Sequence, residues 1–320
     1  MPEASRTIRA ARLKAHGRPL AIESIELAAP KDDEARVELS FAGVNPVDTY
    51  IAAGRVAPDG PLPRTLGGEA AGRLEGRPVL VAGEGLGLAR DGVWAQAAVV
   101  PRAAVVDLPA GVEPREAAAM GVAGLTAWKV VRGLGQVSSE DRVLVLGASG
   151  GVGSMIVSLA RAAGATVWGQ TGSEQKARLI AENGAERVLV GGAEQLLEAL
   201  SGFAPTIVFD PLGDGFVAPA LEALVVGGRL VSFGTSAGPE VQLNMQVLYR
   251  KTISVLGYGG MQLGREERRE GLEAALTALQ AGDLRCVIDD VLPLDRVNDA
   301  FKRLAERKVQ GKLLLDLDGA

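Results

Sequence analysis

The chain has 320 residues, and at roughly 150 residues per domain this length predicts two domains. It carries 34 Lys and Arg against 39 Asp and Glu, and the resulting net charge of −5 argues against general affinity for nucleic acid or an anionic membrane surface. Because it has one Cys (Cys286) and one His (His16), a single chain cannot build a Cys/His zinc site, an iron–sulfur cluster or an internal disulfide.

Glycine is unusually frequent, at 42 of 320 residues, about twice the usual share of roughly 7%. Since 47% of the chain is apolar, this excess indicates tight turns and close backbone approaches rather than disorder. The first ten residues lack the apolar core of a signal peptide, and no run approaches about 18 uninterrupted apolar residues. We therefore expect a cytoplasmic protein that does not enter a membrane.

The first 120 or so residues contain short, β-rich runs separated by Gly and Pro. The clearest are residues 36–41, 79–82, 94–100 and 105–108. This spacing is typical of a small, mostly antiparallel barrel.

From about residue 141 the pattern changes to regular alternation of strands and helices. An apolar run at 143–146 ends in Gly147 and is followed by apolar residues at helical spacing up to Gly164. The pattern predicts further strands at 166–169, 188–190, 206–209, 229–233 and 253–257, and helices at 173–183, 194–201 and 216–226. Six strands alternating with helices predict a doubly wound parallel sheet.

The tail of the chain returns to helices. Residues 265–281 and 294–307 have helical patterns, and a strand-like run follows at 312–317. We expect this tail to pack back on the first domain.

A glycine-rich turn lies between the first strand of the alternating region and its helix. With alanine in the first place, Ala148, Gly150 and Gly153 match the dinucleotide pattern G-x-G-x-x-G. The absent side chain at Gly150 lets the backbone approach a pyrophosphate, Gly153 lets helix and strand pack closely, and the helix N-terminus offers N–H groups. The turn therefore predicts dinucleotide binding; the alternative is a glycine cluster that serves only helix packing.

The end of the second strand indicates which dinucleotide is bound. An NAD-binding domain usually has an acidic residue about here, but residues 169–173 contain none. Ser173 and Lys176 can instead bind a 2′-phosphate, with Arg178 nearby, which favours NADPH. The alternative is that both cations are solvated helix charges, and Glu174 counts against NADPH unless it points away.

Several motifs spread over nearly the whole chain resemble the medium-chain dehydrogenase/reductase superfamily, in its zinc-free quinone oxidoreductase (zeta-crystallin-like) branch. The matching segments are residues 43–50 (GVNPVDTY), 66–72 (LGGEAAG), 124–128 (GLTAW), 148–153 (ASGGVG), 231–234 (VSFG) and 311–315 (GKLLL).

The resemblance implies an α/β fold with two domains. A GroES-like partly open β-barrel catalytic domain would comprise residues 1–122 and 260–320, and a Rossmann-type six-stranded parallel sheet domain residues 123–259. In zinc-dependent relatives a Cys ligand stands at the position of Asn45 and a His ligand at that of Gly68. The resemblance therefore implies a metal-free site.

The resemblance also implies the residues of the cofactor site. Asn45 and Tyr50 would lie near the nicotinamide, with Thr126 close by. The other cofactor-binding residues would be Ser149, Gly150, Gly151 and Val152 at the pyrophosphate; Gly172, Ser173 and Lys176 at the adenosine phosphate; and Phe233, Gly234 and Thr235 beside the ribose and nicotinamide.

Hydride transfer to an acceptor requires alignment and a donor for the developing oxyanion. Asn45 and Tyr50 can both donate, although Tyr50 can equally be a packed aromatic; Asp48 is either an acid–base group or a local hydrogen-bond anchor. Without a metal as Lewis acid, an electron-poor acceptor is favoured. We therefore predict an NADPH-dependent, zinc-independent quinone oxidoreductase. The alternatives are an enoyl or alkenal reductase acting on an activated C=C bond and a non-catalytic NADPH-binding protein.

The resemblance further implies a homodimer, formed through the strand near residues 255–258.

Overall fold

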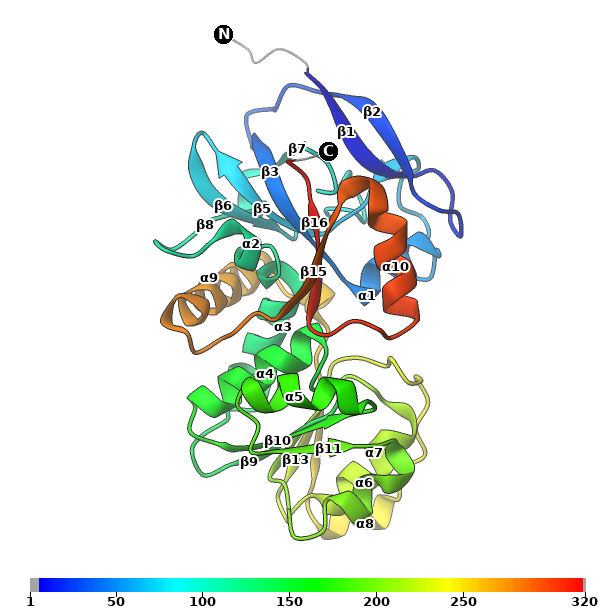
Figure 1. The fold of residues 1–320 in the computed structure, drawn as a ribbon, viewed down its shortest axis with the longest axis vertical. Helices are drawn as coiled ribbons and strands as arrows, with labels where there is room; N and C mark the ends of the chain where they lie inside the picture. Colours follow the sequence, from blue (N-terminus) through cyan, green and yellow to red (C-terminus); the bar gives the residue numbers. More distant parts are fainter. Residues whose placement is uncertain (1–5, 319–320) are drawn as a thin grey trace. The chain divides into compact units, whose positions relative to one another are not determined.

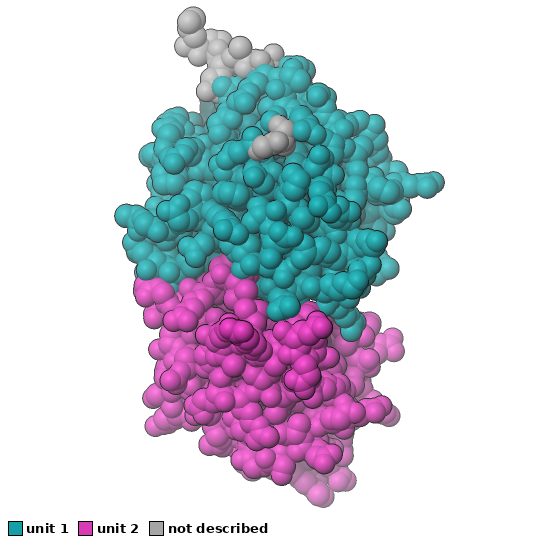
Figure 2. Space-filling view, in the orientation of Figure 1, with its two compact units in different colours: residues 1–125, 264–280, 288–320 teal, residues 126–263, 281–287 magenta. Residues whose placement is uncertain are grey.

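The computed structural model describes residues 6–318, and the chain folds into two compact units (Figure 2). Unit 1 comprises Met1–Leu125, Gly264–Gln280 and Ile288–Ala320, and unit 2 comprises Thr126–Leu263 and Ala281–Val287. Most of the tail thus belongs to unit 1, while a short piece of it joins unit 2.

Unit 1 is built on two sheets (Figure 1). A three-stranded antiparallel sheet has the order β2-β1-β4, and a second sheet has the order β15-β16-β3-β5-β6-β8, with β7 also pairing with β3. Only β15 and β16 pair in parallel in these sheets, so the mostly antiparallel prediction is confirmed. The strands are β1 (Arg6–Leu13), β2 (Ala21–Leu27), β3 (Glu34–Val44), β4 (Arg64–Thr65), β5 (Glu69–Leu74), β6 (Arg77–Ala82), β7 (Ala97–Pro101), β8 (Val105–Asp107), β15 (Ile288–Pro293) and β16 (Lys312–Asp316).

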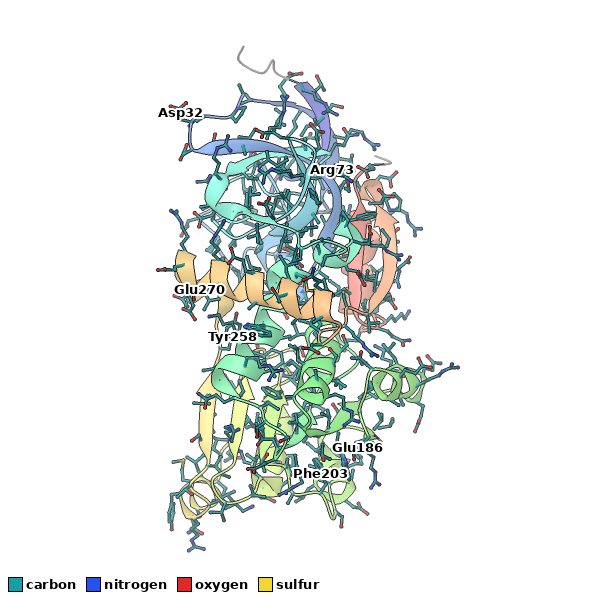
Figure 3. All side chains as sticks on the ribbon, turned by 90° about the vertical axis from the view of Figure 1, so that its left-hand side faces the viewer. Asp32, Arg73, Glu186, Phe203, Tyr258 and Glu270 are labelled. Atoms are coloured by element: carbon teal, nitrogen blue, oxygen red, sulfur yellow. The ribbon has the colours of Figure 1, made fainter. Side chains whose placement is uncertain are left out.

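The helices of unit 1 are short except for one. They are α1 (Pro46–Ala52), α2 (Pro114–Ala117), α9 (Arg265–Ala281) and α10 (Val297–Ala305), with single turns η1 (Arg102–Ala104), η2 (Met120–Gly124) and η6 (Leu294–Arg296). Along α9, Leu272, Ala275 and Leu276 are buried while Glu270 is exposed (Figure 3), as expected for an amphipathic surface helix.

Trp94 is the largest fully buried side chain of unit 1. Its ring packs edge-on against Phe301, with the centroids 5.7 Å apart, and its Nε1 donates to the Gly43 carbonyl oxygen at 3.1 Å. Gly67 lies against the ring with φ +95°, and a Cβ there would come within 2.3 Å of Trp94 Cδ1. Both the backbone conformation and the packing therefore require glycine at this position.

Unit 2 is a six-stranded parallel sheet in the order β11-β10-β9-β12-β13-β14, which confirms the doubly wound prediction. The strands are β9 (Arg142–Val145), β10 (Thr166–Thr171), β11 (Arg187–Val190), β12 (Ile207–Asp210), β13 (Arg229–Ser232) and β14 (Ser254–Gly257). The helices are α3 (Leu125–Trp128), α4 (Gly151–Ala162), α5 (Glu174–Glu182), α6 (Ala193–Ala199), α7 (Val217–Ala223) and α8 (Met245–Arg250), with turns η3 (Lys129–Leu134), η4 (Asp214–Phe216) and η5 (Gly260–Gln262). The short helix α8 was not among the predicted helices.

Aromatic stacking contributes to the core of unit 2. Phe203 (Figure 3) stacks on Trp168 with ring centroids 4.0 Å apart and planes 10° apart, and the Arg187 guanidinium lies 4.7 Å from the Trp168 ring. Across residues 6–318, no helix combines the length and the apolar character needed to cross a membrane.

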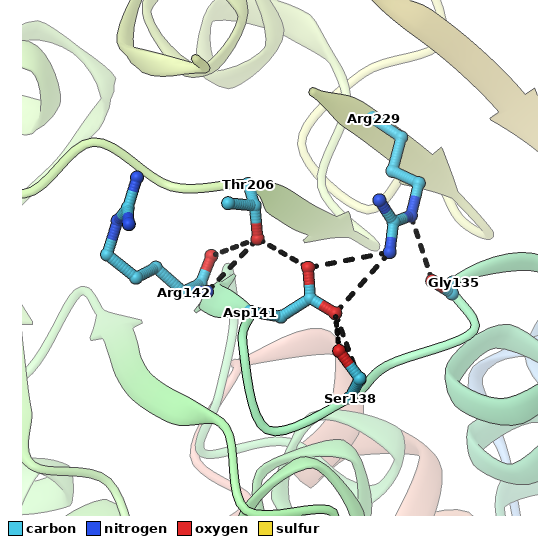
Figure 4. A network of polar contacts seen from close by, with 6 residues as sticks. All are labelled: Gly135, Ser138, Asp141, Arg142, Thr206 and Arg229. Carbon is cyan, nitrogen blue, oxygen red and sulfur yellow. Dashed lines mark hydrogen bonds and ion pairs between the residues drawn. The ribbon is translucent and has the colours of Figure 1, made fainter. Parts of the chain in front are cut away.

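A polar network joins the amino-terminal ends of β9, β12 and β13 (Figure 4). We call it the Asp141 network; its members are Gly135, Ser138, Asp141, Arg142, Thr206 and Arg229. Asp141 accepts from the Thr206 hydroxyl at 2.7 Å and from the backbone N–H of Ser138 at 2.9 Å. It also forms a longer contact of 3.5 Å with Arg229. The network fixes the relative positions of three strand starts.

Candidate active site

Four buried polar side chains of unit 1 lie at the carboxyl end of β3: Asn45, Asp48, Glu69 and Lys312. Strand β3 lies between β16 and β5 and runs antiparallel to both, so its last residues meet the first residues of both neighbours. Asn45 directly follows β3, Lys312 begins β16, and Glu69 begins β5. Three side chains that are far apart in sequence therefore meet at one place.

These three side chains form one fully buried hydrogen-bonded group, which together with Asp48 we call the Glu69 cluster. Lys312 Nζ donates to Glu69 Oε1 at 2.8 Å and to Asn45 Oδ1 at 2.6 Å, and Asn45 Nδ2 donates to Glu69 Oε1 at 2.7 Å. The backbone N–H of Val122 donates to Glu69 Oε2 at 2.7 Å. Both carboxylate oxygens are therefore bonded, as a buried charge requires.

Two glycines leave the space that the Glu69 carboxylate occupies. A Cβ at Gly43 would lie 2.2 Å from Glu69 Oε1, and a Cβ at Gly121 would lie 2.7 Å from Glu69 Cβ. The side chain of Glu69 is 0% exposed and that of Lys312 is 3% exposed. The fold is thus shaped around this ion pair.

Asp48 belongs to the same cluster through the start of α1. Asn45 is the N-cap residue of the helix, and its backbone N–H donates to Asp48 Oδ2 at 2.8 Å. Burial raises the pKa of Asp48 to about 7; the hydrogen bond from Asn45 lowers it, the nearby Glu69 charge raises it and Lys312 lowers it. Of the two roles considered for Asp48, acid–base group and local hydrogen-bond anchor, these contacts favour the anchor.

Tyr50 lies apart from this cluster. Positions 48 and 50 of one helix project about 200° from each other, and Tyr50 is 37% exposed while Asp48 is 3% exposed. The structure therefore brings together Asn45 and Asp48 among the three predicted catalytic residues, and turns Tyr50 to the outer face of α1.

In unit 2, the glycine turn has the predicted strand–turn–helix form, with Gly150 as the N-cap residue of α4. A Cβ at Gly153 would lie 2.4 Å from the Gly147 carbonyl oxygen, so this glycine is needed for packing. A Cβ at Gly150 would meet only that same oxygen, at 3.4 Å, an ordinary contact. The fold therefore does not require glycine at 150, and the open space lies at the N-terminus of a helix whose first N–H groups have no partner within it.

The other predicted cofactor residues of unit 2 lie at the same edge of the sheet, because the carboxyl ends of parallel strands coincide. Ser149, Gly151 and Val152 form the turn and the start of α4; Gly172, Ser173 and Lys176 follow β10; and Phe233, Gly234 and Thr235 follow β13. Ser149 Oγ lies 3.3 Å from Thr171 Oγ1. Thr126 lies in α3 and is half-buried.

Gln170 of β10, which was not among the predicted residues, supports the glycine turn through hydrogen bonds. Its Oε1 accepts from the Gly147 N–H at 3.1 Å, its Nε2 donates to the Gly191 carbonyl oxygen at 2.7 Å, and its own carbonyl oxygen accepts from Ala148 N. One buried side chain thus ties the turn after β9 to the turn after β11.

Glu69 and Lys312 were also missed, although the sequence carries a signal for each. Glu69 is a single charge between Gly68 and Ala70, and Lys312 is a single cation before three leucines. An isolated charge in an apolar strand is rarely buried unless it is paired. Within residues 6–318, no group of three or more His, Cys, Asp or Glu side chains is arranged to hold a metal ion.

Comparison with known proteins shows that this chain is similar to dehydrogenases and quinone oxidoreductases. Residues 151–277 match the family model described as zinc-binding dehydrogenase. Quinone oxidoreductase 1 of Escherichia coli is 30% identical over 319 residues, covering 94% of this chain and 97% of that protein.

Two solved structures share the fold. A mycobacterial protein in complex with NADPH has 24% identity, covers 97% of this chain and 99% of its own, and gives a TM-score of 0.84. A Bacillus subtilis protein with NAD bound has 25% identity, covers 98% and 100%, and gives a TM-score of 0.83. From these matches and the fold, the chain is an oxidoreductase that belongs to the medium-chain dehydrogenase/reductase superfamily, in its quinone oxidoreductase branch.

Proposed function

We propose that the chain is an NADPH-dependent, zinc-independent quinone oxidoreductase. The observation that carries this proposal is the environment of Asn45. At the position where zinc-dependent relatives have a Cys ligand, this chain has an amide bonded to Glu69 and Lys312. Gly68 stands at the position of the His ligand, so the site supplies hydrogen-bond donors where relatives supply metal ligands.

The residues at the edge of the unit 2 sheet fit a nicotinamide dinucleotide. The open space at Gly150 and the N-terminus of α4 suit a pyrophosphate, while Gln170 holds the turn in place. When bound in its reduced form, the cofactor supplies the hydride. The two similar solved structures contain NADPH and NAD respectively, so we base the choice of cofactor on the residues near the adenosine ribose.

Lys176 is the residue to which we assign NADPH preference. It lies in the first turn of α5, after Ser173, and is half-buried. Arg178 on the same helix is exposed and pairs with Glu182 at 2.6 Å, so it is a poorer candidate for a phosphate ligand. A cation in the first turn and the N–H groups of that turn together suit a 2′-phosphate.

In this function the residues of unit 1 bind and polarise the acceptor. Asn45 Nδ2 carries a second hydrogen beyond the one donated to Glu69 and can donate to a quinone oxygen that gains negative charge. Tyr50, which is 37% exposed on the outer face of α1, is the alternative donor through its hydroxyl. Asp48 holds the backbone N–H of Asn45 and so acts as a positioning residue.

The test measures NADPH oxidation with a panel of quinones, then with enones and with enoyl substrates. We expect turnover with quinones. Turnover with the activated alkenes alone would favour the alkenal reductase alternative, and NADPH binding without any turnover would favour the non-catalytic one.

The glycine turn gives a second test with a matched control. Gly150→Val should abolish NADPH binding in a folded protein, because its side chain fills space that the fold leaves open. Gly153→Val should instead lower the melting temperature, because its Cβ clashes with the Gly147 carbonyl. Tight NADPH binding by folded Gly150→Val would contradict the assignment.

The preference for NADPH is tested at Lys176. Lys176→Glu should raise the KM for NADPH far more than the KM for NADH, because it places a negative charge near the 2′-phosphate. Arg178→Glu is the control and should change neither value. Equal changes for both cofactors in Lys176→Glu would contradict the assignment.

We also propose a homodimer formed through β14. In the described sheet this strand pairs only with β13, so one edge of it presents unpaired backbone groups, and Val255 is 46% exposed. Val255→Lys should convert a dimer to a monomer in sedimentation experiments. A monomeric wild-type protein would refute the proposal.

A further inference from the structure

We propose that Glu69 and Lys312 are positioning residues that hold the side-chain amide of Asn45 in one orientation, so that its Nδ2 always presents an N–H to the acceptor. This inference rests on the proposed function, since it names the groups that let Asn45 present only an N–H, and not its oxygen, to the acceptor. Glu69 and Lys312 do not themselves touch the acceptor.

The chemistry of the two neighbours determines the orientation of the amide. A Lys ammonium can only donate, so the Asn45 atom that faces Lys312 Nζ at 2.6 Å must be the oxygen. An ionised carboxylate can only accept, so the atom that faces Glu69 Oε1 at 2.7 Å must be the nitrogen. In a flipped amide, the Asn45 nitrogen would face the Lys312 ammonium, donor against donor. The Asn45 oxygen would face the Glu69 carboxylate, acceptor against acceptor.

The surroundings hold the side chains of Glu69 and Lys312 in place. Glu69 accepts three hydrogen bonds, including one from the Val122 backbone, and Gly43 and Gly121 enclose its carboxylate. The Lys312 side chain is 3% exposed and begins a strand whose next residue, Leu313, pairs with Val44 of β3. The backbone register of the sheet therefore fixes where each charge lies.

With its oxygen bonded to Lys312, the amide cannot rotate to offer an acceptor to the ligand. The second hydrogen on Nδ2 is used in neither of these two bonds, and we assign it to a carbonyl oxygen of the acceptor. This suits an acceptor class whose reacting oxygen becomes more negative as it is reduced, and a quinone carbonyl has this property.

The test exchanges donor and acceptor across the contact between residues 45 and 69. Asn45→Asp places two carboxylates 2.7 Å apart and should lower the melting temperature and kcat. The double variant N45D/E69Q restores one donor and one acceptor, and keeps one negative charge beside Lys312. Its melting temperature should rise well above that of Asn45→Asp, because Glu69→Gln can accept from Val122 with its oxygen and donate to position 45 with its amide nitrogen. Recovery is partial, since that nitrogen also faces Lys312 Nζ at 2.8 Å, which can only donate.

The double variant should nevertheless remain slow, because no N–H is left at position 45. We expect kcat with a quinone to stay roughly 100-fold below wild type, as for loss of one oxyanion donor. Recovery of kcat together with the melting temperature would overturn the proposal.

The single variant Glu69→Gln tests positioning separately from folding. Without the carboxylate the flipped amide is no longer opposed on that side, so kcat should fall several-fold while the KM for NADPH stays constant, measured well below the melting temperature. An unchanged kcat would contradict the positioning role.

The two proposals can fail separately. If the wild-type protein reduces no quinone, the proposed function fails, and the melting temperatures of Asn45→Asp and N45D/E69Q still test the amide orientation. If the wild type turns over and Asn45→Asp melts at the wild-type temperature, the orientation fails and the function stands.

Discussion

The Glu69 cluster of unit 1 and the Asp141 network of unit 2 both combine a carboxylate, a cation and neutral hydrogen-bonding groups, but they differ in burial and in what they hold. The Lys312–Glu69 pair is 2.8 Å apart, with side chains 3% and 0% exposed. The Arg229–Asp141 pair is 3.5 Å apart, with side chains 28% and 10% exposed.

The partners of the two networks suggest different purposes. Around Asp141 the bonds reach backbone groups: Thr206 Oγ1 accepts from Arg142 N, and Arg229 Nε donates to the Gly135 carbonyl oxygen (Figure 4). Around Glu69 the bonds orient a side-chain amide that keeps one hydrogen available. A buried ion pair is a poor means of stabilisation, since desolvation offsets most of its attraction. We infer that the Glu69 cluster orients a side chain of the candidate active site, whereas the Asp141 network stabilises the sheet of unit 2.

Breaking the buried pair should have the largest effect. Lys312→Met leaves the Glu69 carboxylate buried without a cation, so we expect a loss of about 3–5 kcal/mol in the free energy of unfolding. Urea denaturation at pH 7 measures this loss.

The double variant K312M/E69Q is the control, because it removes both charges. It should recover most of the lost stability. Its kcat should remain low, since the two side chains that orient the Asn45 amide are both replaced. If K312M/E69Q is as unstable as Lys312→Met, unpaired charge is not the cause of the loss.

Asp48 gives the next largest effect, as a dependence of stability on pH. Because burial raises its folded-state pKa from 3.8 to about 7, the folded protein binds more protons than the unfolded chain between these values. This contribution to stability is present below about pH 4, falls as pH rises towards 7 and is lost above it. At 1.36 kcal/mol per pKa unit, the full loss is roughly 4 kcal/mol.

Asp48→Asn isolates this contribution, because it removes the titration while its side-chain oxygen can still accept from Asn45 N–H. The wild-type protein should lose more stability than Asp48→Asn between pH 4 and 8, in urea denaturation at each pH. Parallel pH profiles would show that Asp48 does not titrate in this range.

The sequence predicted unit 2 more fully than the site of unit 1, for a physical reason. Strand–helix alternation and the glycine turn are local patterns, and the parallel sheet follows from short crossovers. The Lys312–Glu69 contact joins residues 243 positions apart and depends on the register of β16 and β5 against β3. Alternating periodicity indicates which face of a strand is buried, but not which residues of two strands far apart in sequence lie opposite each other.

Gln170 and α8 show the same limit on a smaller scale. Gln170 reads as an ordinary polar residue at a strand end, and only the adjacency of β9 and β11 to β10 gives its amide two backbone partners. Helix α8 has six residues and none of them is buried, so it has little apolar periodicity to detect. By contrast, Asn45 and Asp48 lie in one short segment, residues 43–50, that carries the family resemblance, so both were among the predicted residues.

The Asp141 network should give the smallest effect and one confined to stability. Asp141→Asn weakens the contact with Arg229 and removes one acceptor from Ser138, so we expect a loss of about 1–2 kcal/mol, because the pair is long and partly solvated. Since its bonds end on backbone groups at the amino-terminal ends of the strands, kcat and the KM for NADPH should stay at wild-type values below the melting temperature. A lowered kcat in folded Asp141→Asn would show that this network also positions the site, and the distinction between the two networks would fail.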